Sequence, residues 1–241
     1  MAQGWNWQGF ADYLVNPYIL QGAITTLWLT LASIAGGLVL GGALALARLS
    51  SRAWLHAPAH FYIWVFRGTP LLVQLIIIYT GLPQLGLKLS VVESALLGLI
   101  LNEAAYLAEV IRGGIQGVPA GQVNAARAVG LSASQSMRFV VMPQAMRLIV
   151  PTLGNSINGL LKTTSVTSVI SMEELLRRTQ VLIQEKFMVL ELFVVAALYY
   201  LLMTTAWDFV QRRIERHYGR AYRTSSAAAV PAVDAGAMAS R

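Results

Sequence analysis

The sequence predicts an all-α membrane protein with five spanning helices and one polar excursion on the cytoplasmic side. Hydrophobic residues make up 56% of the 241 residues and charged residues only 12%, and the mean hydropathy is +0.58. Soluble domains average about 45–50% apolar and about 25% charged residues. The segment 14–46 carries no charge, whereas 118–143 is a polar stretch between two apolar ones. These observations indicate a chain that crosses a bilayer several times.

The first predicted span is residues 22–47, preceded by an N-terminal arm, residues 1–21, in the extracytoplasmic space or the membrane interface. As a helix the span would be ~39 Å long, enough to cross ~30 Å of hydrocarbon with some tilt. The Trp and Tyr residues of the arm favour the headgroup region. Within the span, Gly37 and Gly41 form a small-residue face that lets another helix approach closely.

Four further apolar segments complete a transmembrane domain that we expect to cover residues 22–215. These spans are 57–79, 91–111, 148–170 and 187–209. The cytoplasmic coupling loop, about 114–146, lies between the third and fourth spans. The last residues, 216–241, are expected to form a cytoplasmic tail whose low-complexity end is disordered, because small residues provide too little apolar surface for a core.

The basic residues orient these spans. With the N-terminus outside, the cytoplasmic side carries Arg48, Arg52, Arg112, Arg127, Arg138, Arg147, Arg212, Arg213, Arg216, Arg220, Arg223 and Arg241. The opposite side carries only Lys88, Arg177, Arg178 and Lys186. Because Lys and Arg accumulate in short cytoplasmic loops, the N-terminus is predicted outside and the C-terminus in the cytoplasm. Topology thus explains the pI near 10.0, and no aromatic and basic patch points to nucleic acid.

The sequence offers no site for covalent chemistry. Its lack of cysteine excludes disulfides and thiolate metal sites, and its three histidines lack ligand spacing. Neither a GxxxxGK[ST] phosphate-binding loop nor a Ser-His-Asp or paired-carboxylate arrangement stands out. We therefore predict that the chain is not an enzyme and holds no metal.

The polar excursion carries the signals of two short helices. Pro119 suits the first turn of a helix, and Gly130 suits the left-handed residue just past a helix end. Ser132 and Gln135 have the spacing of a capping box. The second helix is expected to end before Pro143, whose ring disfavours helical geometry at the preceding residue. The predicted excursion is a helix, a tight glycine turn and a second helix.

The first of these helices suits a docking role. Its side chains are mostly small, at Val123, Ala125, Ala126 and Ala128. Such a thin rod can enter a groove on another protein. The alternative is a helix that lies on the bilayer surface, with Arg127, Arg138 and Arg147 against anionic lipid. We predict docking.

The excursion resembles the EAA loop of permease subunits of bacterial ABC importers, which reads EAA, three residues, G, nine residues and I-x-L-P. The matching residues are Asn124, Ala125, Ala126, Gly130, Val140, Met142 and Pro143. Patterns similar to those of polar amino-acid permeases extend over about residues 9–220 and include Arg67–Gln74, Ala105–Glu109 with Arg112–Ile115, and Leu161–Ser165. Asn124 replaces the glutamate of the motif, so no charge-dependent contact is carried over to it.

This resemblance implies a five-helix type I ABC importer fold in a bacterial plasma membrane. Two such subunits, identical or homologous, would form the pathway, and an extracytoplasmic solute-binding protein would deliver the substrate. Two cytosolic ATPase subunits would bind ATP and Mg and receive the coupling loop, while this chain binds no cofactor itself. The resemblance assigns the coupling role to Asn124, Ala125, Ala126, Arg127, Gly130 and Pro143.

Ionisable residues at bilayer depth cost at least ~2.5 kcal/mol each and usually line a pathway or pair with one another. By this criterion Arg67, Glu103, Glu109 and Lys162 are site candidates. Helical phase adds amide and hydroxyl partners on the third and fourth spans. The predicted substrate pathway is Arg67, Asn102, Glu103, Tyr106, Asn158, Lys162 and Ser165.

Instead of binding substrate, these charges could form structural ion pairs between helices. The two possible pairs are Arg67 with Glu109 and Lys162 with Glu103. Glu103 is the better substrate candidate because transporters bind their cargo near the midplane. We predict a subunit of an ATP-driven importer that moves polar amino acids or close analogues by alternating access. The alternatives are a proton-coupled carrier that uses Glu103 and a membrane scaffold. A carrier would leave the polar excursion without a role, and a scaffold would leave the costly charges near the midplane without a role.

Overall fold

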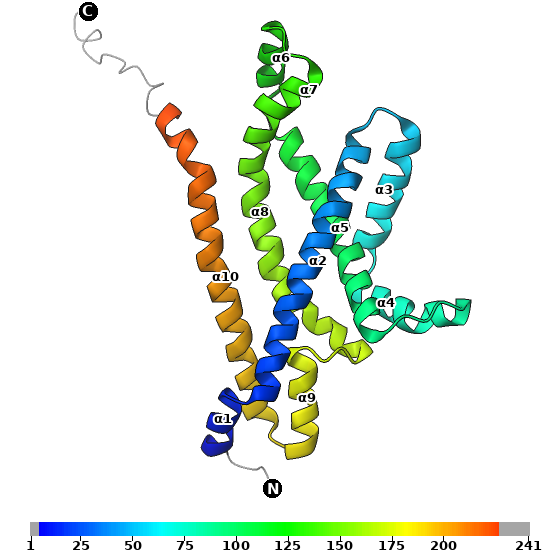
Figure 1. The fold of residues 1–241 in the computed structure, drawn as a ribbon, viewed down its shortest axis with the longest axis vertical. Coiled ribbons are helices and arrows are strands. Elements are labelled where there is room, and N and C mark those ends of the chain that lie inside the picture. The colour runs from blue at the N-terminus through cyan, green and yellow to red at the C-terminus, as the bar shows by residue number, and fades with distance from the viewer. Residues whose placement is uncertain (1–4, 227–241) are drawn as a thin grey trace, which may run out of the picture.

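A computed structural model describes residues 5–226, and every regular element within that range is a helix. The coupling loop with α6 and α7 lies at one end of an elongated bundle, and α1 and α9 lie at the other (Figure 1). The elements, with π- and 3-10 helices labelled η, are α1 Trp7–Leu14, α2 Pro17–Leu49, α3 Ala53–Gly68, α4 Leu71–Ile76, η1 Ile77–Gly81, η2 Leu82–Leu85, α5 Val91–Gln116, α6 Ala120–Ala128, α7 Ala133–Ser136, η3 Met137–Val141, α8 Met142–Thr163, η4 Thr164–Ile170, α9 Leu175–Lys186 and α10 Val189–Ser226.

Helices α2 and α5 pack closely through glycines of α2. A β-carbon added at Gly41 would lie 2.9 Å from the carbonyl oxygen of Ala104, and one added at Gly37 would lie 3.2 Å from Cγ of Glu103. The two helices are therefore closer than a larger residue at either position would allow. The small-residue face predicted on the first span is confirmed.

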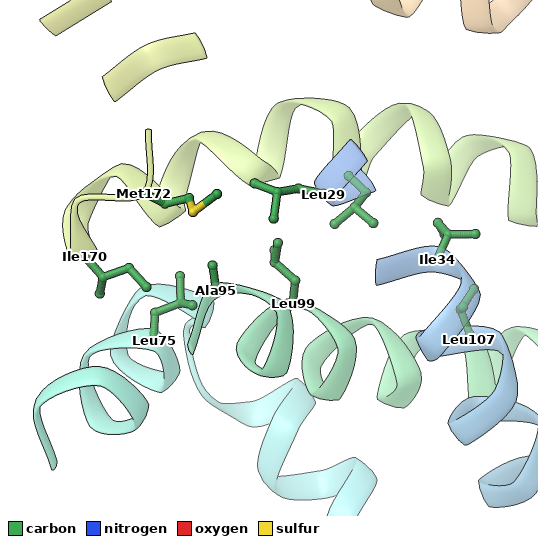
Figure 2. Close-up of a cluster of buried hydrophobic side chains, with 9 residues drawn as sticks. Leu29, Ile34, Leu75, Ala95, Leu99, Leu107, Ile170 and Met172 are labelled. Carbon is green, nitrogen blue, oxygen red and sulfur yellow. The ribbon is translucent and has the colours of Figure 1, made fainter. Parts of the chain in front are cut away.

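A buried apolar cluster joins α2 and α5 to the broken second span. Leu29 of α2, Leu75 of α4 and Leu99 of α5 meet Ile170 and Met172 around η4 (Figure 2). Because lipid is as apolar as these side chains, their van der Waals contacts, rather than removal from water, hold the helices together. The cluster fixes the positions of α4 and η4 against α5.

By length and apolarity, three helices within the described residues can cross a membrane, namely α2, α5 and residues Val189–Arg216 of α10. A fourth crossing arises if α3 and the segment after it count as one bent span. The fourth predicted span, 148–170, corresponds to most of α8 followed by η4, so its last turns have the tighter 3-10 geometry. Helix α8 is not among the helices that pass this test of length and apolarity, so the test supports up to four of the five predicted spans.

The second predicted span, 57–79, is not one continuous helix. Helix α3 ends at Gly68, and Leu71–Leu85 continues at an angle of 104° to it. Thr69 is extended, with φ −120° and ψ 144°. A residue that precedes proline is disfavoured in the helical region, and Pro70 itself has no N–H to continue the ladder. The Thr69–Pro70 pair therefore breaks the span.

The coupling loop contains the predicted helix, glycine turn and helix. Gly130 has a left-handed φ of 86°, and both hydrogen bonds of the Ser132–Gln135 capping box are present. Pro119 is the N-cap of α6 rather than its first helical residue. The prediction that the second helix ends before Pro143 is wrong, because α7 passes through the π-helix η3 directly into α8. Pro143 is the second residue of α8 and thus lies within one continuous helical run, directly after the π-helical turn.

At the opposite end, Glu174 caps α9 and ties it to α2 and α10. Its carboxylate accepts hydrogen bonds from the backbone N–H of Leu176 (3.0 Å) and Arg177 (2.8 Å) and from the Tyr200 hydroxyl (2.9 Å). The hydroxyl of Thr26 lies 3.5 Å away. Burial raises the pKa of the Glu174 carboxyl above its ordinary value, against the opposing effect of these donors.

Helix α10 extends well beyond the predicted span 187–209, because it continues as a helix to Ser226. It thus includes the first part of the predicted tail, 216–241. The low-complexity end of that tail, expected to be disordered, lies outside the described residues, as do the first four residues of the N-terminal arm. The rest of the arm contains α1, whose N-cap Asn6 donates its backbone N–H to the Glu191 carboxylate at 2.8 Å.

Candidate functional site

A cavity of about 400 Å³ lies where the break in the second span faces α5 and α8. Its walls come from three parts of the chain. They are Thr69, Pro70 and Leu71 at the break, Asn102, Glu103 and Tyr106 on α5, and Ser156, Gly159, Leu160 and Thr163 on α8. The cavity therefore combines one carboxylate with amide, hydroxyl and phenol groups.

Glu103 is the only carboxylate, and the only side chain of a charged type, in the cavity wall formed by the described residues. Its side chain lies beside Gly37, and the residue is 8% exposed. One carboxylate oxygen, Oε1, is buried without a hydrogen-bond partner among the residues described. A buried acceptor left unsatisfied costs about 1–3 kcal/mol. A hydrogen-bond donor that reached this oxygen would remove that cost.

Gln74 holds the broken span in place beside this carboxylate. Its Nε2 donates to the carbonyl oxygens of Phe66 (2.9 Å) and Thr69 (3.1 Å), both at the helix break. Its Oε1 accepts a hydrogen bond from Nδ2 of Asn102 at 3.0 Å. Backbone groups freed by the break thus find side-chain partners, as bilayer depth requires.

The predicted residues Arg67 and Tyr106 lie together at one side of the cavity. The guanidinium carbon of Arg67 is 5.4 Å from the centre of the Tyr106 ring. Nη1 of Arg67 is 3.9 Å from Glu109, so the ion pair considered as a structural alternative is present as a long contact. Arg67 is not part of the cavity wall.

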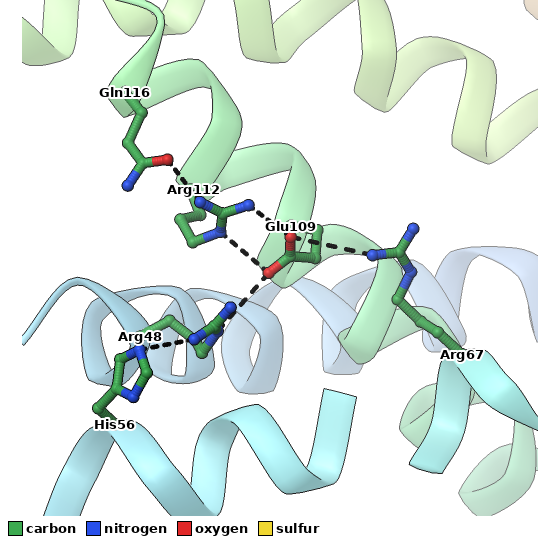
Figure 3. Close-up of polar contacts among 6 residues, drawn as sticks. All are labelled: Arg48, His56, Arg67, Glu109, Arg112 and Gln116. Carbon is green, nitrogen blue, oxygen red and sulfur yellow. Dashed lines mark hydrogen bonds and ion pairs between the residues drawn. The ribbon is translucent and has the colours of Figure 1, made fainter. Parts of the chain in front are cut away.

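Glu109 is the centre of a cluster of three arginines (Figure 3). Arg112 binds both of its oxygens, at 3.0 Å from Nε and 2.7 Å from Nη2, whereas Nε of Arg48 is 3.8 Å away. The cluster joins the ends of α2, α3 and α5 through one carboxylate. The tight partner of Glu109 is therefore Arg112, one helical turn further along α5, and not Arg67.

The structure does not bring the predicted residues of the fourth span into the cavity. Nδ2 of Asn158 donates to Asp208 of α10 at 2.6 Å. Lys162 is exposed, and Ser165 donates its hydroxyl to the carbonyl of Lys162 at 2.6 Å. Within the described residues Glu103 forms no ion pair, so the Lys162–Glu103 pair does not form.

Sequence reasoning missed the α8 residues that do line the cavity, Ser156, Gly159 and Thr163. They recur at the helical spacing of three and four residues, and Gly159 and Thr163 each follow a predicted residue, Asn158 and Lys162, by one position. From the sequence, Thr69 with Pro70 indicates a broken helix near Arg67, but neither Thr69 nor Gln74 was predicted to belong to the site. A signal was available, because an uncharged polar residue within an apolar run directly after a helix break marks a place where freed backbone groups need partners.

The coupling-loop residues lie at the far end of the molecule from α1 and α9 (Figure 1). Asn124, Ala125 and Arg127 of α6 are exposed, and Ala126 is buried against the rest of the loop. Exposed apolar side chains adjoin them, with Val129 at 78% and Phe139 at 61% exposure. Gly130 and Pro143 are also exposed. The loop therefore presents an uncovered apolar surface next to basic residues.

Comparisons with known proteins agree on one family. Residues 37–220 match the family described as the binding-protein-dependent transport system inner membrane component. The chain is 37% identical to the arginine transport system permease protein ArgU of Corynebacterium glutamicum over 231 residues, covering 90% of this chain and 73% of ArgU. It is 44% identical to the octopine transport system permease protein OccM of Rhizobium meliloti, covering 81% and 82%, and 36% identical to the glutamine transport system permease protein GlnP of Escherichia coli, covering 83% and 92%.

Solved structures show the same fold. A crystal structure of an amino acid ABC transporter with histidines superposes with a TM-score of 0.84 at 35% identity, covering 89% of this chain and all of the matched one. An inward-facing structure of the MetNI methionine ABC transporter has a TM-score of 0.71 at 19% identity, covering 83% and 96%. The second likeness concerns the fold alone.

Proposed function

The chain belongs to the family of inner membrane components of binding-protein-dependent transport systems, and from this premise we propose that it moves polar amino acids or close analogues into the cell. The observation that carries the proposal is the buried carboxylate of Glu103, which lines a cavity of about 400 Å³ with one oxygen unpartnered. Relatives named for arginine, octopine and glutamine transport support this substrate class.

The cavity chemistry suits an α-amino acid. A substrate ammonium group is a threefold donor, and a charge-assisted hydrogen bond to the Glu103 carboxylate is about twice as strong as a neutral one. Hydroxyls of Ser156 and Thr163 and the amide of Asn102 line the same cavity and supply further partners. Arg67, beside Tyr106, offers a cation for a substrate carboxylate.

The energy for transport comes, in this proposal, from other chains. Two cytosolic ATPase subunits hold ATP and Mg and dock on the coupling loop, whose exposed apolar residues Val129 and Phe139 support such a contact. A second permease subunit completes the pathway, and an extracytoplasmic binding protein delivers the substrate. The coupling loop then faces the cytoplasm, with α1 and α9 at the outer surface of the plasma membrane.

Family membership favours this ATP-driven mechanism over the proton-coupled carrier that we considered from sequence. The two mechanisms differ in what they require. An importer of this family needs a binding protein and ATP, whereas a carrier needs a proton gradient.

The test is uptake into proteoliposomes that contain the chain with its ATPase subunits and binding protein. We expect uptake of labelled amino acids to require enclosed ATP and the binding protein, and to persist when an ionophore collapses the proton gradient. Uptake without ATP that the ionophore abolishes would overturn the proposal. Sugars and peptides at equal concentration serve as controls for the substrate class.

A further inference from the structure

The break in the second span leaves two backbone carbonyl oxygens without helical partners. The carbonyl of Phe66 would bond the N–H four residues on, but that residue is Pro70, which has none. The N–H of Val73, four residues after Thr69, bonds the carbonyl of Pro70 instead, at 3.0 Å. Nε2 of the buried Gln74 donates to both free carbonyls, at 2.9 and 3.1 Å. Because a carbonyl oxygen can only accept, these bonds fix which end of the Gln74 amide faces the break.

The fixed amide of Gln74 in turn fixes the amide of Asn102 on α5. The Oε1 of Gln74 can only accept, so the nitrogen of Asn102 must point toward it. Nδ2 of Asn102 donates to this oxygen at 3.0 Å and to the carbonyl of Phe66 at 3.4 Å. Both amide hydrogens of Asn102 are thereby engaged. Its Oδ1 has no hydrogen-bond partner among the described residues, and Asn102 therefore contributes an acceptor to the cavity that it lines.

The other polar side chains of the cavity wall also offer mainly acceptors. The hydroxyls of Thr69 and Thr163 donate their hydrogens to the backbone carbonyl four residues earlier, at 2.8 and 3.1 Å. Glu103 contributes a carboxylate, which cannot donate. Among the described side chains of the wall, only the hydroxyls of Ser156 and Tyr106 keep a hydrogen that can turn into the cavity. The side chains of the wall therefore present more acceptors than donors to a substrate.

The wall also carries one uncompensated negative charge. Glu103 is its only side chain of a charged type and forms no ion pair within the described residues. A buried charge is costly unless it is paired. An amino acid with an uncharged side chain is a zwitterion without net charge, whereas one with a basic side chain carries one net positive charge. The basic amino acid is therefore the better electrostatic match to the cavity.

We propose that the cavity selects amino acids whose side chain ends in a guanidinium or ammonium group, and that Gln74 is a positioning residue for this selectivity. The inference rests on the proposed function and narrows its substrate class. Guanidinium and ammonium groups carry N–H donors and no acceptor, whereas a neutral carboxamide also has a carbonyl oxygen, which would face the acceptors of the wall. Gln74 acts through Asn102. Without Gln74, the amide of Asn102 is free to turn its N–H groups into the cavity.

Competition between L-arginine and L-citrulline tests the selectivity. The two molecules have the same length, but citrulline is neutral and has a carbonyl oxygen in place of one guanidinium nitrogen. Labelled arginine is bound to the purified complex of permease and ATPase subunits without the separate binding protein, so that only the membrane site is measured. We expect citrulline to bind about tenfold or more weakly, because it leaves Glu103 uncompensated and places an acceptor against acceptors. Equal affinities, or tighter binding of citrulline, would overturn the proposal.

Gln74→Met tests the positioning role. Methionine has a similar length but no N–H donor for the break and no amide oxygen for Asn102. We expect the ratio of the citrulline to the arginine dissociation constant to fall about threefold or more, mainly through weaker arginine binding. A purely structural role would change both affinities equally and leave this ratio unchanged. The matched control is Gln84→Met on the same broken span, where the side chain is exposed and bonds the carbonyl of Thr80 at 3.4 Å. Its ratio should equal that of the wild type.

Asn102→Ala is a second variant that keeps the proposal testable if Gln74→Met does not fold, as thermal melting in detergent would show. It leaves both bonds from Gln74 to the break in place, removes the Oδ1 acceptor and should lower the ratio as well. An unchanged ratio in either folded variant would contradict the proposal. ATP-dependent uptake of arginine and citrulline at equal rates would reject the selectivity alone. Selective binding of arginine without ATP-dependent uptake would reject only the proposed function.

Discussion

The backbone of Ala104 on α5 lies so close to Gly41 on α2 that a β-carbon at position 41 would be 2.9 Å from the Ala104 carbonyl oxygen. This contact occurs one residue from Glu103, the carboxylate in the candidate cavity. The distance between the two helices at this point is thus limited by direct contact of their backbones, without an intervening side chain. Gly41, together with Gly37 beside Glu103, thus lets α2 approach the part of α5 that carries the cavity residues.

Gly41→Ala should therefore destabilise the bundle, because the methyl group forces α2 and α5 apart. Overpacking of this kind costs about 1–3 kcal/mol. Gly42→Ala is the matched control, since a β-carbon there meets nothing within 4 Å and alanine is favoured over glycine within a helix by about 0.5–1 kcal/mol. Unfolding in detergent measures both variants. A melting temperature for Gly41→Ala as high as that of Gly42→Ala would show that the helices separate without cost.

Gly130→Val should disconnect the coupling loop from the ATPase subunits without unfolding the spans. Position 130 has a φ of 86°, where an L-residue with a side chain costs about 1–2 kcal/mol, so valine would turn α6 away from its docked direction. Gly130→Asn is the control, because asparagine tolerates the left-handed region. The measurement is co-purification of the ATPase and substrate-stimulated ATP hydrolysis. If the Gly130→Val variant kept both ATPase co-purification and substrate-stimulated hydrolysis at wild-type values, this turn would have no part in the coupling mechanism.

Glu174 should make stability depend on pH. Burial raises its pKa above the ordinary value of 4.5, so the folded chain retains a proton at pH values where the unfolded chain has released it. The stability that this group contributes is complete below about pH 4.5 and is lost as the pH rises through the folded-state pKa. The free energy of unfolding in detergent should therefore fall over this interval.

The variant Glu174→Gln should weaken this pH dependence, and Glu173→Gln is its control. Glu173 is adjacent, but its side chain is 61% exposed and paired with Arg178 at 3.3 Å. The free energy of unfolding is measured at several pH values from 4.5 upward, and its slope against pH is compared between each variant and the wild type. Identical slopes in Glu174→Gln and wild type would show that the buried carboxyl does not titrate in this range.

Local signals in the sequence predicted the fold class and the coupling loop because they act over a few residues. The turn at Gly130 depends only on the backbone conformation of that residue, and the capping box depends only on Ser132 and Gln135. The effect of Pro143 was predicted wrongly because the helix continues through this residue, directly after the π-helical turn η3. That widened turn depends on packing that the sequence does not reveal.

The candidate cavity was predicted in part, and the reason lies in rotation about helix axes. Asn102, Glu103 and Tyr106 share one face of α5 and do line the cavity. On α8, Asn158 instead faces α10 and bonds Asp208, which is 50 residues away in the chain. Which neighbour an amide faces depends on how α8 packs between α5 and α10, and periodicity within one helix does not contain that information.

The same cavity provides the strictest test of the proposed function, the substitution Glu103→Gln. Glutamine keeps the size and most of the hydrogen-bonding capacity of the side chain but removes the charge that would face a substrate ammonium group. Loss of one charge-assisted hydrogen bond costs about 1.5–3 kcal/mol, so we expect substrate affinity to fall about 10- to 150-fold. Binding to the complex without its binding protein measures this, alongside uptake in proteoliposomes.

Glu93→Gln is the matched control for this substitution, since it lies on the same helix at its capped N-terminus, where glutamine can cap as glutamate does. We expect Glu93→Gln to bind and transport as wild type. In Glu103→Gln the assembly with the ATPase and the basal hydrolysis should persist, because no residue of α6 or α7 lines the cavity. Unchanged affinity would remove Glu103 from the substrate site, and collapse of the complex would assign the carboxylate to the packing of α5 against α2.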